Sequence, residues 1–274
     1  MSSDNLLEKV KKLREITGVG FKDCKAAIDE TKGDIEKSID LLRKKGISKA
    51  NKRSERTAAE GLVCIYEKDN SFSIVEINSE TDFVAKNNEF INFSEETSEI
   101  AFQKKGKIND ILNTKMKNQK DVNTNLIDLV SKIGEKISFR RSDFISADNC
   151  INFSYIHSAV KKNVGKLGVI LSLETKKSKN DIMEFGKQLS MQVAATSPLS
   201  IDKDTLDQKV LEKEKEIIKE ELKNTGKDSK IVDKIAIGKL NKFIAENTLL
   251  DQEWIMDPEK KVKDIIKEVG GKEK

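Results

Sequence analysis

The first fifty residues carry apolar residues at helical spacing in three short segments. Each segment places three or four of them on one face: Leu6, Val10 and Leu13; Phe21, Cys24, Ala27 and Ile28; Ile35, Ile39 and Leu42. Thr17-Gly18-Val19-Gly20 separates the first two helices, Gly33-Asp34 the next two, and Gly46 is expected to end the third. The pattern predicts a separate three-helix module in residues 1–54, where a basic linker from Ile47 to Glu60 begins.

The apolar period then changes from that of a helix to that of a strand. Leu62 to Tyr66 and Phe72 to Ile77 are rich in β-branched and aromatic residues, and Lys68-Asp69-Asn70-Ser71 between them resembles a turn. A β-hairpin is therefore predicted. Helices from Asn87 to Lys104 and from Asn123 to Ile133, then a strand from Ile137 to Ile145, complete a predicted α+β subdomain over residues 55–147.

A similar order of elements recurs further along the chain. Strands are predicted at Ile151 to His157 and Leu167 to Glu174, followed by a helix whose stripe is Ile182, Phe185, Leu189 and Val193. Lys260 to Val269 reads as a short amphipathic helix. These segments predict a second, related α+β subdomain over residues 148–200 and 247–274, so the fold class is α+β.

Residues 201–246 predict an antiparallel helical hairpin. The first helix carries two apolar stripes, the return helix carries one, and a turn is expected at Asn224-Thr225-Gly226: Leu206, Val210 and Ile217; Leu211, Ile218 and Leu222; Val232, Ala236, Leu240 and Phe243. The hairpin either packs on its own domain or projects and contacts another chain, including a second copy of itself. Both alternatives stay open, because the seven-residue spacing is too short to prove a coiled coil.

Charge and composition narrow the function. The chain has 51 basic and 47 acidic residues, a net charge of +4, so no strong attraction to nucleic acid over the whole surface is expected. Most basic residues are Lys, whereas base and phosphate recognition favours Arg. An RNA-binding or ribosome-associated protein acting through the linker between Lys49 and Arg56 remains the alternative, although a solvated connector is favoured there.

The residues needed for enzyme chemistry are missing from the sequence. Cys24, Cys64 and Cys150 show no paired spacing, His157 is the single His, and no Gly-Lys pair is followed by Ser or Thr. We expect no enzyme, no cofactor or metal, no nucleotide binding, no membrane span and a cytoplasmic location. On its strand, His157 alone would more often be structural than a ligand.

Several motifs together resemble the elongation factor Ts family of bacteria. They run along nearly the whole chain: Leu13-Arg14-Glu15-Ile16-Thr17-Gly18-Val19-Gly20, Asp23-Cys24-Lys25-Ala26-Ala27, Gly33-Asp34-Ile35-Glu36, Glu76-Ile77-Asn78-Ser79-Glu80-Thr81-Asp82-Phe83-Val84-Ala85-Lys86-Asn87, Lys132-Ile133-Gly134-Glu135-Lys136-Ile137 with Arg140-Arg141, Tyr155-Ile156-His157 and Val193-Ala194-Ala195. The resemblance implies a ubiquitin-associated-like module, two core subdomains and a helical hairpin. It also implies guanine-nucleotide exchange on elongation factor Tu, including displacement of that partner's magnesium. A ubiquitin-like adaptor built on the first module would leave the rest of the chain unexplained.

The resemblance also assigns residues. Thr81, Asp82, Phe83 and Val84 take the role at the partner's magnesium, while Arg14, Phe21, Lys22 and His157 make further partner contacts. Thr81-Asp82 has in addition the pattern of a helix N-cap, with Phe83 as a hydrophobic staple, and both interpretations can hold together.

This sequence departs from the family at three places. Phe21-Lys22 stands where some relatives have paired methionines, and Val160-Lys161-Lys162-Asn163 is expected to lengthen the loop after His157. Family members commonly continue beyond the last helix, whereas this sequence stops at Gly270-Gly271-Lys272-Glu273-Lys274. The chain is either naturally short or truncated there, and its affinity for elongation factor Tu is expected to be reduced.

Overall fold

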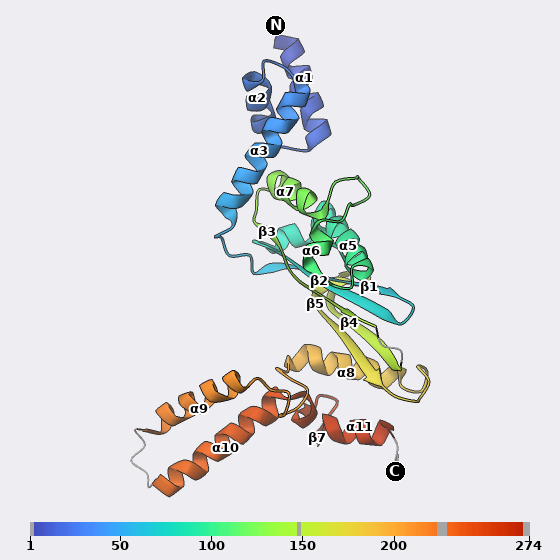
Figure 1. The fold of residues 1–274 in the computed structure, drawn as a ribbon, viewed down its shortest axis with the longest axis vertical. Coiled ribbons are helices and arrows are strands. Elements are labelled where there is room, and N and C mark those ends of the chain that lie inside the picture. The colour runs from blue at the N-terminus through green and yellow to red at the C-terminus, as the bar shows by residue number, and fades with distance from the viewer. Residues whose placement is uncertain (1–2, 147–148, 224–228, 271–274) are drawn as a thin grey trace. The chain divides into compact units, whose positions relative to one another are not determined.

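A computed structural model describes residues 3–146, 149–223 and 229–270 (Figure 1). By contact the chain divides into two compact units. Residues 1–146 and 156–170 form the first, and residues 147–155 and 171–274 form the second. The finer division into a module, two subdomains and a hairpin insertion stays a prediction.

The first unit begins with the predicted three helices, α1 (Ser3–Thr17), α2 (Phe21–Glu30) and α3 (Ile35–Arg53). Their shared core contains the residues of the predicted stripes: Val10, Leu13, Cys24, Ala27, Ile28 and Leu42. Gly18 follows α1 with a left-handed φ of +66° and donates its backbone N–H to the carbonyl of Arg14 at 2.7 Å. A glycine in this conformation closes the helix, as the sequence predicted.

Two predictions at the end of this module are wrong. Gly46 does not end α3, which continues to Arg53, so half of the expected linker is helical. A Cβ on Gly46 would lie 2.4 Å from Oγ of Ser131 in α7 (Val122–Ile133), so the glycine serves a close approach between helices. Arg53 donates to the carbonyl of Val130 at 3.0 Å, and Arg56 donates to Glu80 at 3.3 Å. These two arginines of the segment are thus bonded within the chain.

A five-stranded sheet with strand order β3-β2-β1-β5-β4 follows the module. The predicted hairpin of β1 (Glu60–Lys68) and β2 (Ser71–Ser79) turns at two residues in the left-handed region, Asp69 with φ +48° and Asn70 with φ +58°. This geometry matches the right-handed twist of paired strands. The remaining strands are β3 (Ile137–Ile145), β4 (Cys150–Lys161) and β5 (Val164–Glu174). Strand β5 joins β1 through Gly165 opposite Val63.

Helices cover the β1–β2 hairpin in the first unit. They include the predicted α5 (Asn88–Gln103) and α7, the short α4 (Asp82–Ala85), which begins where the Thr81-Asp82 cap pattern places a helix, and α6 (Ile108–Leu112), which the sequence did not predict. One apolar cluster joins sheet and helices, with fully buried members such as Ile77, Phe90 and Val122. We call residues 60–146 the core of the first unit.

The β4–β5 hairpin corrects a further prediction. Val160 and Lys161 belong to β4, so the connection to β5 is the two residues Lys162 and Asn163, with Asn163 at φ +63°. The segment after His157 therefore lengthens a strand rather than a loop. Asn tolerates the left-handed conformation better than most residues, which suits a tight turn.

The second unit contains the predicted α8 (Met183–Thr196) and a C-terminal helix, α11 (Val262–Gly270). The helix begins two residues later than predicted, because 257–261 form the strand β7 (Asp257–Lys261), which pairs with β6 (Glu253–Trp254). A short 3₁₀ helix, η1 (Leu249–Asp251), precedes them. Phe185 and Trp254 stack at 6.1 Å within an apolar cluster that also contains Leu189 and Val262.

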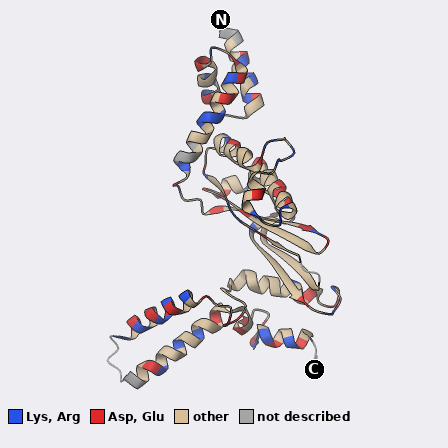
Figure 2. Cartoon of the chain, viewed as in Figure 1, with Lys and Arg blue, Asp and Glu red and all other residues tan. Residues whose placement is uncertain are grey.

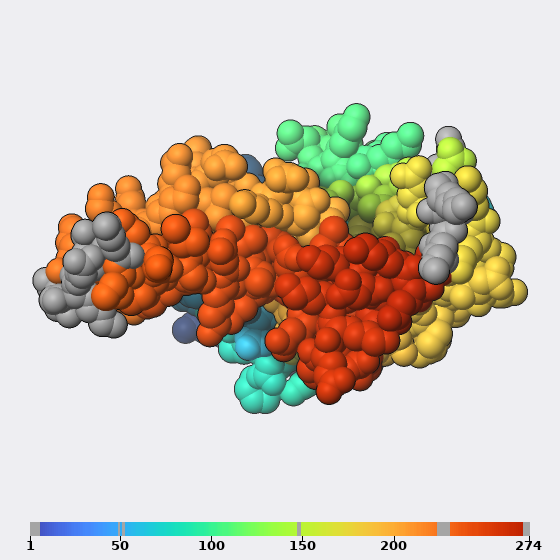
Figure 3. Space-filling view, turned by 90° about the horizontal axis from the view of Figure 1, so that it is seen from below, coloured from blue at the N-terminus to red at the C-terminus, as the bar shows by residue number. Residues whose placement is uncertain are grey.

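Helices α9 (Gln208–Lys223) and α10 (Ser229–Asn247) lie side by side in the second unit (Figures 1 and 3). Charges of both signs follow one another along α9 (Figure 2). Its stripe of Leu211, Ile218 and Leu222 is buried, whereas Ile217 of the other stripe is 49 % exposed. The predicted turn at Asn224-Thr225-Gly226 lies outside the described residues.

The fold class is α+β, as predicted, with an N-terminal three-helix module and helices packed on antiparallel strands. Within the described ranges, no helix is both long enough and apolar enough to span a lipid bilayer.

Candidate functional site

The candidate site is the turn that leads from β2 into α4. Val84 and Ala85 are buried against the sheet, at 5 % and 0 % exposure, and fix the inner side of the short helix. Phe83 points the other way and is 78 % exposed, more than any other large apolar side chain among the described residues. Leaving a phenylalanine in water costs about 1.5–3 kcal/mol relative to burying it, so the ring has apolar surface available to bury against another molecule.

Two carboxylates hold this turn. Thr81 donates its backbone N–H and its hydroxyl to Glu135, at 3.0 and 2.7 Å. Glu80 accepts the backbone N–H of Lys136 at 2.6 Å and a bond from Arg56 at 3.3 Å. We call Glu80 and Glu135 the carboxylate clamp. It fixes the backbone on the N-terminal side of Phe83.

The N-cap interpretation is only partly right. Thr81 occupies the N-cap position of α4, but its side chain makes no capping bond because the hydroxyl is bonded to Glu135. Phe83 does not act as a staple, since most of its surface is exposed. The residue that caps a helix here is Asn87, whose side-chain oxygen accepts the N–H groups of Glu89 and Phe90 at the start of α5.

Asp82 faces solvent and pairs with Lys86 one turn later, at 2.9 Å. This hydrogen bond lowers the pKa of the Asp82 carboxyl below its usual range. The pKa of Glu80 is also lowered, first by the N–H of Lys136 and then, against a small cost of burial, by Arg56. Both carboxylates are therefore ionised at neutral pH, and the turn presents one aromatic ring beside fixed negative charge.

The end of α7 places Glu135 next to Thr81. Gly134 ends the helix with φ +86° and donates its N–H to the carbonyl of Val130 at 3.0 Å. The chain then enters β3, so Glu135 and Lys136 lie beside the β2–α4 turn. The segment from Lys132 to Ile137 is one of the family motifs in the sequence, but no role for Glu135 follows from the sequence. The available signal was the charged pair Glu135-Lys136, which stands between Gly134 at the helix end and the strand that begins at Ile137.

The module carries a second group of predicted residues. Arg14 lies in the last turn of α1, and Phe21 and Lys22 begin α2, so all three flank the α1–α2 turn. Each is exposed, Phe21 by 43 %. Cys24 supports the turn from beneath, because its thiol donates to the carbonyl of Val19 at 3.3 Å. The last predicted contact residue, His157, belongs to neither turn. It is an exposed residue of β4, across from Gly165 of β5.

The predicted residues thus come from three elements: the β2–α4 turn, the α1–α2 turn and the β4–β5 hairpin. The described parts of the chain contain no group of three or more His, Cys, Asp or Glu side chains that could hold a metal ion. Burial raises the pKa of the Cys64 thiol to about 12, so that group is not a nucleophile at neutral pH. The geometry suits contact with a protein surface.

Comparison with known proteins finds similarity over nearly the whole chain. A family model described as elongation factor TS matches residues 80–273, which include the β2–α4 turn. A protein named elongation factor Ts from Bartonella quintana is 41 % identical over 267 residues, covering 96 % of this chain and 87 % of its own. Proteins of the same name from Gluconobacter oxydans and Clostridium kluyveri are 38 % and 42 % identical, again over 96 % of this chain and 87 % of theirs.

Proposed function

The chain belongs to the elongation factor Ts family of translation factors, and from this membership we propose that it is a guanine-nucleotide exchange factor. It binds elongation factor Tu that carries GDP, promotes release of the GDP and allows GTP to bind. It acts in the cytoplasm and makes or breaks no covalent bond.

The observation that supports this proposal is the exposure of Phe83 on a turn whose other side is fixed. Val84 and Ala85 anchor the helix, and Glu135 holds Thr81 through two hydrogen bonds. A fixed turn loses little conformational entropy on binding. Most of the free energy gained by burying the ring therefore contributes to the affinity. In our proposal Phe83 enters an apolar site that elongation factor Tu offers only in the conformation that has lost its magnesium.

The mechanism follows from linkage between two ligands of one protein. A factor that binds nucleotide-free Tu more tightly than the GDP complex must weaken GDP binding by the same ratio. Incoming nucleotide expels the factor for the same reason. Burying most of one phenylalanine in only one of the two states supplies about 1.5–3 kcal/mol, or roughly a 10- to 150-fold shift between them.

The remaining predicted residues act in binding. Thr81, Asp82 and Val84 hold or flank Phe83, with Asp82 adding negative charge near the displaced magnesium site. Arg14, Phe21 and Lys22 contact the same GTPase domain from the α1–α2 turn, and His157 contacts it from β4. Phe21 replaces a family methionine with another apolar side chain, and its 43 % exposure leaves ring surface to bury.

The experiment is rapid mixing of elongation factor Tu loaded with fluorescent GDP against this protein and excess unlabelled GDP. The unmodified protein should accelerate loss of signal. Phe83→Ala should lower that rate about 10-fold or more, since it removes the ring whose burial favours the nucleotide-free state.

Leu7→Ala is the matched control, because Leu7 is also a large exposed apolar residue, at 45 %, and no role in binding is proposed for it. It should leave the rate unchanged. An unchanged rate with Phe83→Ala would disprove the role of the ring, and no acceleration by the unmodified protein would disprove the exchange function.

A further inference from the structure

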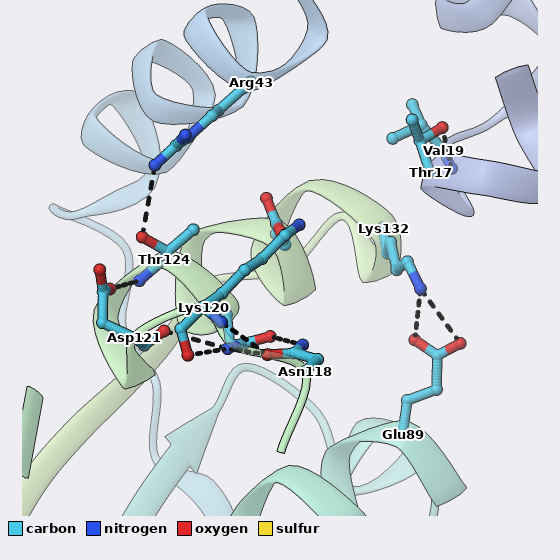
Figure 4. Close-up of polar contacts among 11 residues, drawn as sticks. Thr17, Val19, Arg43, Glu89, Asn118, Lys120, Asp121, Thr124 and Lys132 are labelled. Carbon is cyan, nitrogen blue, oxygen red and sulfur yellow. Dashed lines mark hydrogen bonds and ion pairs between the residues drawn. The ribbon is translucent and has the colours of Figure 1, made fainter. Parts of the chain in front are cut away.

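A crevice of about 500 Å³ lies between the three-helix module and the core of the first unit (Figure 4). The module lines it with the α1–α2 turn and α3, and the core lines it with α5, α7 and the segment between α6 and α7. Because this space is not filled by side chains, the module and the core do not share one continuous packed interface. Their relative position depends on a few separate contacts.

Helix α3 makes one set of these contacts, all with α7. Arg43 donates to the hydroxyl of Thr124 at 3.5 Å, Arg53 donates to the carbonyl of Val130 at 3.0 Å, and Gly46 lies against Ser131. These contacts follow one side of α3, where Ala50 also packs against the apolar cluster of the core, so they hold the module along a single line.

Lys132 supplies a contact on the other side of the module. A Cβ on Gly18, in the α1–α2 turn, would lie 2.3 Å from Cε and 2.7 Å from Nζ of Lys132. The ammonium group continues to α5, where it lies 3.3 and 3.4 Å from the two carboxylate oxygens of Glu89 (Figure 4). The side chain therefore extends from α7, passes beneath the glycine of the turn and is fixed at its end by an ion pair.

We propose that Lys132 is a positioning residue that sets the orientation of the module, so that the α1–α2 turn and Phe83 meet one partner surface together. The inference rests on the proposed function. Helix α7 is suited to this task because its next residues, Gly134 and Glu135, lead to and hold the turn of Phe83. Two binding groups held by one element act at a high effective concentration, which is lost when one of them moves freely.

The orientation itself can be measured without the partner. Spin labels at Lys11→Cys in α1 and Asp110→Cys in α6, with Cys150→Ser to remove the accessible native thiol, report the distance between module and core by pulsed dipolar spectroscopy. The unmodified protein should give one narrow distance distribution. Lys132→Ala and Glu89→Gln, which remove the ion pair from opposite ends, should both broaden it.

Lys37→Ala is the matched control, because Lys37 is 77 % exposed on α3 and pairs with Asp34 of the module at 3.1 Å. It should leave the distribution unchanged. Gly18→Ala should displace the module by itself, through its left-handed φ and the close approach of Lys132, and its effect should shrink in a Lys132→Ala background. Distributions that stay narrow in Lys132→Ala and Glu89→Gln would overturn the proposal.

Exchange measurements then separate positioning from the action of Phe83. In a titration of elongation factor Tu·GDP, Lys132→Ala should raise the half-saturating concentration about three- to ten-fold, because the α1–α2 turn loses part of its effective concentration at the partner surface. The rate at saturation should persist, because Phe83 and Glu135 are intact, and Lys132→Arg should restore affinity. A lower saturating rate with unchanged half-saturation would contradict positioning, whereas no exchange by the unmodified protein would refute the function and leave the distance measurement decisive.

Discussion

The carboxylate of Glu135 should determine how well Phe83 works, although it does not touch the ring. Glu135→Ala removes the acceptor of two hydrogen bonds from Thr81, at 3.0 Å from the backbone N–H and 2.7 Å from the hydroxyl. Hydrogen bonds to a charged group contribute about 1.5–3 kcal/mol each when buried. Since this pair is half-buried, about 2 kcal/mol in total is a reasonable magnitude, which is roughly a 30-fold shift toward the unfixed turn.

Two substitutions at Thr81 separate the contribution of its hydroxyl from that of its backbone N–H. Thr81→Val keeps the backbone bond and removes the hydroxyl, so about half of the free energy should be lost. Thr81→Ser keeps both bonds and is the matched control. The order of turn stability should therefore be unmodified protein, Thr81→Ser, Thr81→Val and Glu135→Ala, with the first two close together.

The assay combines hydrogen exchange with the rapid-mixing measurement. Protection of the Thr81 amide should fall in Glu135→Ala, and the maximal rate of GDP release should drop about three- to ten-fold while the cooperative unfolding transition is retained. Full activity in Glu135→Ala, together with an unprotected Thr81 amide, would refute the reasoning that a fixed turn is needed.

Two further predictions concern stability. The pKa of Glu80 is lowered by the N–H of Lys136, so its contribution to the free energy of unfolding is present above the ordinary glutamate pKa of about 4.3 and is lost as pH falls through the lower folded value. Denaturant melts of Glu80→Gln should accordingly show lower stability at pH 7 and a difference that shrinks as the pH falls below about 4.3; a gap independent of pH would count against the assignment. Gly61→Ala should cost about 2 kcal/mol or more, because φ is +138° and a Cβ would lie 2.2 Å from the carbonyl oxygen of Ile77, whereas Gly238→Ala, with open space around it in α10, should stabilise by about 0.5–1 kcal/mol. Equal effects at the two glycines would contradict this account.

The periodic segments were predictable because their apolar stripes are complete. The helices of the module, the β1–β2 hairpin, and α5, α7 and α8 follow from the spacing of residues such as Val10, Ile77 and Leu189. Helices α4 and α6 were not predictable in this way, since helices of four and five residues are too short to show a period.

The errors have a common physical origin in tertiary contact. Gly46 has the sequence signature of a helix end, but close packing on Ser131 uses the missing side chain instead. Arg53 and Arg56 resemble solvated linker charges, yet each finds an acceptor far away in the sequence. Thr81 has the pattern of an N-cap, but its hydroxyl donates instead to the carboxylate of Glu135, 54 residues away. A sequence pattern shows which local hydrogen bonds and helix ends a residue favours. Contacts with residues distant in the sequence can override these local preferences.

The candidate residues Thr81 to Val84 came from family resemblance, and the sequence alone could not distinguish an exposed Phe83 from a buried one. The exposure of 78 % and the clamp of Glu135 are what the structure adds. Together they show that the ring of Phe83 is exposed on a turn whose backbone is held by hydrogen bonds.

Catalytic turnover is the decisive measurement for nucleotide exchange by this protein. One part of the protein should be mixed with about a hundred parts of elongation factor Tu carrying fluorescent GDP, with unlabelled GTP in excess. We expect nearly all of the bound fluorescent GDP to be lost, at a rate proportional to the amount of this protein. Release limited to one equivalent, or a rate equal to spontaneous dissociation, would contradict this expectation.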